Sequence, residues 1–268
     1  MSITYGFIGC GNMAQAMIGG IVSSGLAQGA DVMASNPSEP KLAAMAERYG
    51  IRTTHDNRAV AASADILVLA VKPHFYENVI EEIRVVVPHD TIVVMIAAGQ
   101  SIAVNAERFG RPVKLVRVMP NTPALVGEAM SAVTFSDSLT SDDREAVLAM
   151  LRSFGRAEEV AESQMDVVTA VSGSSPAYVD LFIEAMADAA VLQGMPRAQA
   201  YTFAAQAVLG AAKMVLETGT HPGVLKDNVC SPGGTTIEAV VSLERSGMRA
   251  AVIDAMNACY RKSKEMSK

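Results

Sequence analysis

Residues 7–14 read Phe-Ile-Gly-Cys-Gly-Asn-Met-Ala. The segment follows a short apolar run, precedes the helical pattern Met13–Ser24, and has the spacing G-x-G-x-x-A. Between a strand and a helix this spacing is typical of dinucleotide-binding sites, in which Gly9 allows a tight turn, Gly11 lets backbone approach a pyrophosphate, and Ala14 permits close helix–sheet packing. The helix start also offers free N–H groups to phosphates. The alternative is a purely structural turn. We expect a dinucleotide to contact Ile8, Gly9, Gly11, Asn12 and Met13.

Short apolar runs alternate with helical patterns through the first half of the chain. The runs cover residues 3–8, 31–35, 66–71, 91–96, 114–118 and 129–135, and the clearest helical patterns are Met13–Ser24 and Pro40–Tyr49. Alternation at about 25–30 residues predicts βαβ units and a mostly parallel sheet. Right-handed crossovers then place helices on both faces. We therefore predict an α/β, Rossmann-like doubly wound sheet over residues 1–160.

The second half has a different pattern, because strand-like runs end at about Ser163. Helical segments are expected at 166–195, 198–217, 235–246 and 248–263, separated by turns rich in Gly and Pro. The segment Asp166–Met195 is dense in Ala and Met and carries four charged residues. A helix that is apolar on nearly all sides must be buried, and about 100 residues can hardly enclose it. We predict an all-α domain over 161–268, with its boundary near Ala161, that is covered by a second subunit.

Composition excludes several classes of protein. The formal net charge is −6, which argues against nucleic acid as a partner, because phosphate binding requires a basic face. Three scattered cysteines are no disulfide framework and suit a reducing cytoplasm. The cysteines and four histidines lack metal-ligand spacing, so no metal is expected. No signal peptide or membrane span is expected, because no charged leader and no apolar run of roughly 18–20 residues occurs.

The end of the second predicted strand indicates which dinucleotide is bound. NAD-binding proteins usually carry a carboxylate there, whereas this chain has Ala34-Ser35-Asn36-Pro37-Ser38. Hydroxyl and amide donors suit a 2′-phosphate, so NADPH is expected to be preferred and NADH to be used less well. Asn57 is a second expected contact. The alternative for Asn36 is an Asx turn before Pro37.

Two later strand ends are expected at the same edge of the sheet. The third predicted strand ends in Ala70-Val71-Lys72-Pro73, and the fourth in Ala97-Ala98-Gly99. Ligands of open α/β sheets lie beyond the carboxyl ends of the strands. Small residues after the fourth strand would let a nicotinamide ribose pack against backbone. We therefore expect cofactor contacts at Ala70, Lys72, Pro73, Ala98 and Gly99, the alternative for Lys72 being a solvated lysine.

The C-terminal half contains one loop with the chemistry of an anion site. The loop Ser231-Pro-Gly-Gly-Thr-Thr236 precedes a helix predicted to open at Ile237. Glycine N–H groups, threonine hydroxyls and a helix N-terminus together suit a carboxylate. The alternative is an ordinary helix start with Thr235 or Thr236 as N-cap. A second serine-rich segment, Ser172–Tyr178, lacks the G-x-S-x-G pattern of hydrolases and predicts a helix start or kink, with Pro176 in the first turn.

Seven motifs, taken together and in order, give the chain a resemblance to a known family. They are residues 7–14, 70–73, 117–124 (Arg-Val-Met-Pro-Asn-Thr-Pro-Ala), 172–178 (Ser-Gly-Ser-Ser-Pro-Ala-Tyr), 221–223 (His-Pro-Gly), 225–228 (Leu-Lys-Asp-Asn) and 231–238 (Ser-Pro-Gly-Gly-Thr-Thr-Ile-Glu). The chain resembles pyrroline-5-carboxylate reductases over nearly its whole length. The last motif is the most specific, whereas the glycine motif alone is shared with other Rossmann proteins.

The resemblance implies reduction of 1-pyrroline-5-carboxylate to L-proline with NADPH, the last step of proline biosynthesis. It implies a homodimer interlocked through the helical domain, five such dimers in a larger assembly, and substrate binding by the same domain. It places the substrate carboxylate on Ser231–Thr236 and the catalytic Thr236 near the ring nitrogen. The expected substrate contacts are Glu162, Ser231, Gly233, Gly234, Thr235 and Thr236, and Asn228 would reach the cofactor from the partner subunit.

Two alternatives remain for the function. One is a related imine or β-hydroxyacid reductase on the same architecture, although hydroxyacid relatives use a lysine on the long helix and Asp166–Met195 contains none. The other is a non-catalytic NADP-binding protein, against which the complete Ser231–Thr236 loop argues. Asn121 and Thr122 are expected either to shape the junction of cofactor and substrate or to form a rigid turn.

Overall fold

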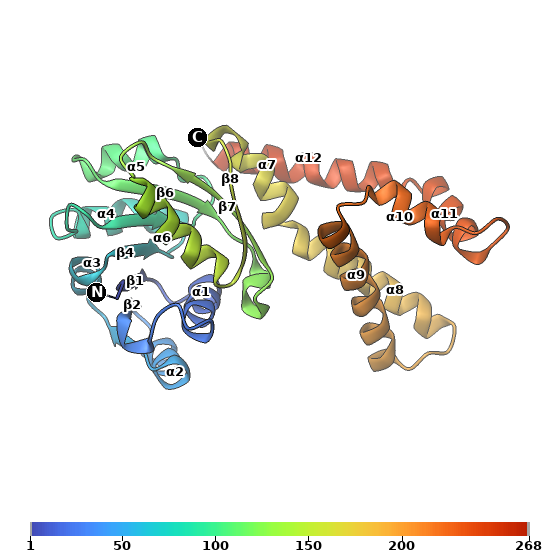
Figure 1. The fold of residues 1–268 in the computed structure, drawn as a ribbon, viewed down its shortest axis with the longest axis horizontal. Helices are drawn as coiled ribbons and strands as arrows, with labels where there is room; N and C mark the ends of the chain where they lie inside the picture. Colours follow the sequence, from blue (N-terminus) through green and yellow to red (C-terminus); the bar gives the residue numbers. More distant parts are fainter. Residues whose placement is uncertain (1, 267–268) are drawn as a thin grey trace. The chain divides into compact units, whose positions relative to one another are not determined.

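The computed structural model describes residues 2–266, which form two compact units (Figure 1). The first unit runs to Ser174 and includes the chain end from Cys259, and the second is Ser175–Ala258. This division differs from the expected split after residue 160, because the segment 161–174 and the chain end group with the sheet. The assignment of 1–160 to NADP binding and 161–268 to dimerisation and substrate binding remains a prediction.

The first unit is built on one eight-stranded sheet. Its strands are β1 (Tyr5–Ile8), β2 (Val32–Ser35), β3 (Arg52–Thr54), β4 (Ile66–Leu69), β5 (Ile92–Met95), β6 (Lys114–Met119), β7 (Ala129–Phe135) and β8 (Gly155–Glu159). Their order is β3-β2-β1-β4-β5-β6-β7-β8, and every neighbouring pair is parallel except β6 and β7. The first six strands have the Rossmann order 3-2-1-4-5-6. The predicted α/β, mostly parallel sheet is confirmed.

Two strands were not expected from the sequence, and both lie at sheet edges. β3 has three residues, and β8 reads Gly-Arg-Ala-Glu-Glu, so neither has the apolar run of a central strand. Short or charged edge strands protect a sheet from pairing with other chains. Their polarity therefore suits the place that they occupy.

Helices cover both faces of this sheet. They are α1 (Asn12–Ser23), α2 (Glu39–Tyr49), α3 (Asn57–Ser63), α4 (Tyr76–Ile83), α5 (Ile102–Phe109), α6 (Ser141–Arg152) and α7 (Met165–Val168), with 3-10 turns at Gly29–Asp31, Pro73–Phe75, Thr122–Val126 and Glu162–Gln164. Side chains of α1, α2 and α6 form one buried cluster, and those of α3, α4 and α5 form the other. Alternate residues of β4 enter opposite clusters, as the two-residue period of a strand requires.

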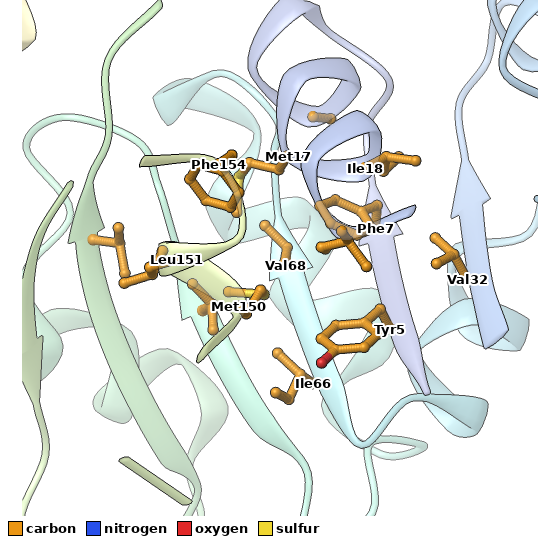
Figure 2. Packing of buried hydrophobic residues seen from close by; sticks show 14 of the residues in the cluster. Tyr5, Phe7, Met17, Ile18, Val32, Ile66, Val68, Met150, Leu151 and Phe154 are labelled. Atoms are coloured by element: carbon orange, nitrogen blue, oxygen red, sulfur yellow. The ribbon is translucent and has the colours of Figure 1, made fainter. Parts of the chain in front are cut away.

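The first cluster is closed by large side chains from distant segments. Figure 2 shows Met17 and Ile18 of α1 above Phe7 of β1, with Phe154 beside Met17. All four side chains are at most 1% exposed. Burying each such side chain contributes roughly 1.5–3 kcal/mol, so this packing fixes α1, and with it the glycine loop, on the sheet.

The second unit is helical, as predicted. Its helices are α8 (Ser175–Leu192), α9 (Arg197–Thr218), α10 (Pro222–Val229), α11 (Thr235–Arg245) and the first part of α12 (Met248–Met266). The expected helix Asp166–Met195 is interrupted: α7 leads into a π-helical turn, Thr169–Gly173, before α8 begins. The kink predicted at the serine-rich segment is confirmed, with Pro176 in the first turn of α8. α10 was missed because Pro222 and Gly223 indicated a turn, whereas His221 caps a helix there by accepting a hydrogen bond from the Gly223 N–H at 3.1 Å.

Apolar side chains of the second unit are largely exposed in the single chain. Within residues 175–258 the buried apolar side chains are Ala187, Ala200 and Ala204. Large exposed ones include Leu181, Leu192, Phe203, Leu209, Leu216, Val241, Leu243 and Ile253. So many large exposed apolar side chains on one helical unit are typical of a surface that is buried in an assembly.

Candidate functional site

The glycine loop has the geometry of a phosphate-binding turn. Gly9 adopts a φ of +101°, and a Cβ there would lie 2.7 Å from the Ala70 carbonyl oxygen, so any side chain would collide with backbone. Gly11 has an ordinary φ of −74°, and a Cβ there would meet no protein atom within 4 Å. Nothing in the chain itself therefore requires glycine at position 11. The open space beside Gly11 fits a ligand that approaches the backbone closely.

The first turn of α1 is suited to an anion. Gly11 is its N-cap residue. No side chain among the described residues caps the N–H groups of this turn, and none of the residues of the turn is acidic. Uncapped N–H groups at a helix start attract phosphate. The expected contacts Ile8, Gly9, Gly11, Asn12 and Met13 all lie on this strand–loop–helix unit.

Asn36 joins the end of β2 to the glycine loop. Its Oδ1 accepts a hydrogen bond from the Cys10 N–H at 3.2 Å, and its Nδ2 donates to the Ser38 carbonyl at 3.5 Å. The carbonyl of Asn36 lies 2.8 Å from His55 Nδ1, while His55 Nε2 lies 2.8 Å from Glu39 Oε2. In an Asx turn the side-chain oxygen accepts from the backbone N–H two residues on, whereas the Oδ1 of Asn36 accepts from Cys10 in the glycine loop, where a cofactor was expected.

Asn57 lies behind Asn36 in the same corner. The Ser35 hydroxyl donates to Asn57 Oδ1 at 2.7 Å, and Asn57 Nδ2 donates to Glu82 Oε2 at 2.8 Å. The side chain therefore supports the end of β2 and has one amide hydrogen left for another contact. Two carboxylates at this corner were not predicted: Glu39 begins α2, directly after β2, and Glu82 comes from α4, which follows β4.

A cation near this corner was also missed. Burial raises the pKa of the buried Cys10 thiol to about 11, and the charge of Lys41 on α2 partly opposes the rise. Lys41 is therefore close enough to the glycine loop to act on it electrostatically. Lys41 is exposed and lies in the first turn of α2, the helix that follows β2. A signal was present in the sequence, since a lysine soon after the second strand can neutralise a 2′-phosphate.

The ends of β4 and β5 meet beside the glycine loop. The Ala70 N–H donates to the Ile8 carbonyl at 2.8 Å, and Lys72 is exposed and without an ion pair among the described residues. Gly99, after β5, has a φ of +76°. The predicted positions Ala70, Lys72, Pro73, Ala98 and Gly99 therefore belong to two adjacent strand ends. The Tyr76 hydroxyl lies between these ends, bonded to both.

Glu162 has partners that the sequence did not predict. Its Oε1 accepts hydrogen bonds from the Ile102 N–H at 2.8 Å and from Arg117 Nη1 at 3.1 Å. The Arg117 side chain is 10% exposed and that of Glu162 is 32% exposed. The expected substrate contact thus has its carboxylate already bound to the start of α5 and to β6.

Asn121 forms a second internal link. Its Nδ2 donates to the Ser172 carbonyl at 3.0 Å, and its Oδ1 accepts from the Met130 N–H at 2.9 Å. Ser172 lies in the π-helical turn, an irregularity that is frequent at functional sites. Asn121 therefore acts as a spacer between β7 and this turn, which favours the structural alternative for this residue.

The serine–glycine loop of the second unit is a tight turn into α11. The Gly234 N–H donates to the Ser231 carbonyl at 3.0 Å, and Gly233 has a φ of +65°. A Cβ on Gly234 would lie 2.3 Å from Ser231 Oγ and 3.1 Å from the Ser231 carbonyl oxygen, so a side chain there would require the Ser231 side chain to move. α11 begins at Thr235, where the helix expected at 235–246 begins, and not at Ile237; the alternative with Thr235 or Thr236 as N-cap is wrong, because the N-cap is Gly234.

The start of α11 lies directly after the glycines of the loop, which bears on what the loop can bind. No side chain caps α11, so the N–H groups of its first turn, which contains Thr235 and Thr236, have no capping partner. Ser231, Gly233 and Thr235 are exposed, and Gly234 and Thr236 are half-buried. Glu238 is the acidic residue of the first turn. The loop is thus a candidate carboxylate site, and Asn228 is an exposed residue of the preceding helix, α10.

Comparison with known proteins gives full-length relatives. Residues 162–266 match the family model described as pyrroline-5-carboxylate reductase dimerisation, and residues 4–99 match that of NADP oxidoreductase, coenzyme F420-dependent. The pyrroline-5-carboxylate reductase of Escherichia coli is 54% identical over 98% of both chains, and that of Methanosarcina acetivorans is 44% identical over 98% of this chain and 97% of its own.

Solved structures agree with these relatives. A pyrroline-5-carboxylate reductase from Coxiella burnetii is 35% identical, has a TM-score of 0.92 and covers 100% of both chains. The Plasmodium falciparum enzyme with NADP bound is 33% identical, with a TM-score of 0.90 over 99% of this chain and 98% of its own. A prephenate dehydrogenase from A. aeolicus, 11% identical with a TM-score of 0.55, shares the fold. No helix among residues 2–266 is long and apolar enough to cross a membrane.

Proposed function

The chain belongs to the pyrroline-5-carboxylate reductase family, and on this premise we propose that it reduces 1-pyrroline-5-carboxylate to L-proline by hydride transfer from NADPH. This reaction is the last step of proline biosynthesis. The observation that carries the proposal is the full-length relationship, supported by two features of this chain. They are the open space beside Gly11 and the uncapped helix start after Gly234.

The residues that would hold NADPH line the carboxyl edge of the sheet. The glycine loop and the first turn of α1 suit the pyrophosphate, and Asn36 and Asn57 are the proposed contacts of the 2′-phosphate. Lys41 and Arg58, whose Nη1 donates to the Glu82 carbonyl, would add positive charge to a corner that also holds Glu39 and Glu82. Ala70, Lys72, Pro73, Ala98 and Gly99 would contact the nicotinamide side. The cofactor supplies the hydride, and the protein supplies its position.

The substrate carboxylate would bind the turn Ser231–Gly234 and the start of α11. Backbone N–H groups there suit an anion, and the left-handed φ of +65° at Gly233 favours glycine at that position. We assign the Thr236 hydroxyl to the ring nitrogen. Glu162 remains a predicted neighbour of the substrate, but its bonds to Ile102 and Arg117 favour a positioning role.

The chemistry needs little from the protein beyond placement. In the protonated imine the carbon is already an electrophile. A hydride adds to that carbon, the electron pair of the double bond moves to nitrogen, and a ring amine results. Since the positive nitrogen accepts the electrons, no strong protein acid is needed in this step. Binding therefore contributes mainly by bringing hydride and carbon together.

The active form is proposed to be a homodimer, with pentamers of dimers as the larger assembly. The helical unit carries extensive exposed apolar surface, and residues 162–266 match a dimerisation model. Asn228 is proposed to contact the cofactor of the partner subunit. Sedimentation at low micromolar concentration should give a dimer or larger, whereas a stable, active monomer would contradict this assembly.

Three free cysteines support a cytoplasmic location.

A second candidate is a related imine or β-hydroxyacid reductase. The hydroxyacid version is disfavoured because residues 166–195, all of them described, contain no lysine to serve as its acid. A non-catalytic NADP-binding protein is the other class.

Isotope transfer separates these candidates directly. The chain should be incubated with 1-pyrroline-5-carboxylate and NADPH deuterated at the transferred position, and the product analysed by mass spectrometry. We expect L-proline with one deuterium at the former imine carbon. Cofactor binding without proline formation would support the non-catalytic class, and turnover of a 2-keto or hydroxy acid alone would support the hydroxyacid class.

A further inference from the structure

Tyr76 is a buried polar residue that the proposed chemistry does not use. It is the first residue of α4, its side chain is fully buried, and it packs within the cluster of α3, α4 and α5. Its hydroxyl donates a hydrogen bond to the Leu69 carbonyl at 2.7 Å. It also accepts hydrogen bonds from the N–H groups of Ile96 and Ala97, both at 3.2 Å. One hydroxyl thus satisfies three backbone groups of two strands.

These three backbone groups lie where β4 and β5 stop pairing. Leu69 and Met95 form the last pair in the register of the two strands, and Ile96 and Ala97 follow directly. Beyond this pair, no backbone hydrogen bond among the described residues joins 70–73 to 96–99. The tyrosine hydroxyl supplies such a link, so it fixes the distance between the two strand ends.

The hydroxyl is held in the form that makes all three bonds. Burial raises the pKa of Tyr76 well above its ordinary value, while the two N–H groups partly oppose the rise. The hydroxyl therefore keeps its proton and can still donate to Leu69. A phenolate would have no proton for that carbonyl.

We propose that Tyr76 is a positioning residue for hydride transfer, acting through the segments Ala70–Pro73 and Ala97–Gly99 that it ties together. The inference rests on the proposed function, because these segments are the proposed contacts of the nicotinamide side. Tyr76 does not touch cofactor or substrate. It sets the separation of the two backbone segments between which the nicotinamide would sit.

A tyrosine that merely filled the core would act differently. Its loss would lower stability and leave the rate of the folded enzyme unchanged. A positioning role predicts a slower hydride step in enzyme that is still folded, because displacements of about 1 Å at a reacting centre can cost up to 10²-fold in rate.

The test is Tyr76→Phe, which removes the hydroxyl and keeps the ring. Tyr5→Phe is the matched control, since Tyr5 is 2% exposed and begins β1, opposite Ile66 at the amino end of β4 and away from Leu69 at its carboxyl end. For both variants kcat, the KM for 1-pyrroline-5-carboxylate and the deuterium isotope effect from labelled NADPH are measured, after circular dichroism confirms the fold. Hydrogen exchange of the Ile96 and Ala97 amides is measured in the wild-type protein.

For Tyr76→Phe we expect kcat to fall about tenfold, the KM to change less than about threefold, and the isotope effect to rise or stay at its intrinsic value. Tyr5→Phe should match the wild type. Wild-type kcat and isotope effect in folded Tyr76→Phe would overturn the proposal.

If Tyr76→Phe does not fold, exchange in the wild type decides. If amides 96 and 97 are protected as strongly as those of β5, their hydrogen bonds to the Tyr76 hydroxyl are supported. If they exchange at the rates of loop amides, the proposal is overturned. If the wild type itself fails to reduce 1-pyrroline-5-carboxylate, the proposed function fails. The exchange of amides 96 and 97 still tests separately whether the Tyr76 hydroxyl links the ends of β4 and β5.

Discussion

Removing the Glu162 carboxylate separates a positioning role from a substrate contact. Glu162→Ala deletes two hydrogen bonds from one oxygen, to the Ile102 N–H at 2.8 Å and to Arg117 Nη1 at 3.1 Å. It also leaves the Arg117 guanidinium, 10% exposed, without its counter-charge. The main expected consequence is a lower free energy of unfolding of the first unit.

The size of this loss follows from the exposure of the pair. Exposed pairs contribute about 0–1 kcal/mol, whereas breaking a buried pair costs about 3–5 kcal/mol. Glu162 is 32% exposed, so the effect should lie between these limits, at about 2–3 kcal/mol. Glu162→Gln keeps an oxygen for the Ile102 N–H and loses only the charge, so it should cost about 1–2 kcal/mol.

Urea unfolding at fixed protein concentration measures these losses, and a double-mutant cycle with Arg117→Met isolates the pair. Residues in direct contact should show a coupling of about 0.5–3 kcal/mol. In parallel, the KM for 1-pyrroline-5-carboxylate is measured for Glu162→Gln, and we expect it to change less than about threefold. A stability change below about 0.5 kcal/mol, together with a KM raised tenfold or more, would refute the reasoning and make Glu162 a direct substrate contact.

Three further outcomes are expected. Thr236→Ala should keep the fold and NADPH affinity and lower kcat/KM about ten- to a hundredfold, because one hydrogen bond to the developing amine costs about 1–3 kcal/mol; wild-type turnover would remove Thr236 from the mechanism. Asn36→Asp keeps an acceptor for the Cys10 N–H and adds negative charge, so titration should give weaker NADPH binding, and an unchanged affinity would mean that the 2′-phosphate lies elsewhere. Burial raises the pKa of Cys10 to about 11, so at pH 8 it stays a protonated thiol, and iodoacetamide with mass spectrometry should label it only after unfolding; rapid labelling of the native chain would contradict its burial.

Sequence patterns predicted those elements of the fold that are repeated along the chain or encoded by a local motif. Apolar runs located the six central strands, and the glycine spacing located the first helix with the turn before it. β3 and β8 were missed because edge strands need no apolar run. α10 was missed because a proline and a glycine begin it, although proline at a first helical turn is favourable.

The candidate site was predicted in its backbone parts and missed in its side-chain links. The glycine loop and the strand ends follow from local motifs. Glu162 and Ile102 are 60 positions apart, and Asn121 and Ser172 are 51 apart, so no local pattern joins either pair. A threonine N-cap for α11 was the alternative to the anion site, because a threonine hydroxyl can accept a hydrogen bond from a helix start. The N-cap is instead Gly234, whose N–H donates to the Ser231 carbonyl at 3.0 Å.

The most direct test of the account is turnover of 1-pyrroline-5-carboxylate with NADPH and NADH in parallel, on the same preparation of the wild-type chain. We expect L-proline from both cofactors, with the higher kcat/KM for NADPH, because the proposed contacts of the 2′-phosphate are the amides of Asn36 and Asn57 and the charge of Lys41. Higher kcat/KM for NADH would contradict the proposed phosphate site. No proline from either cofactor would contradict the function itself.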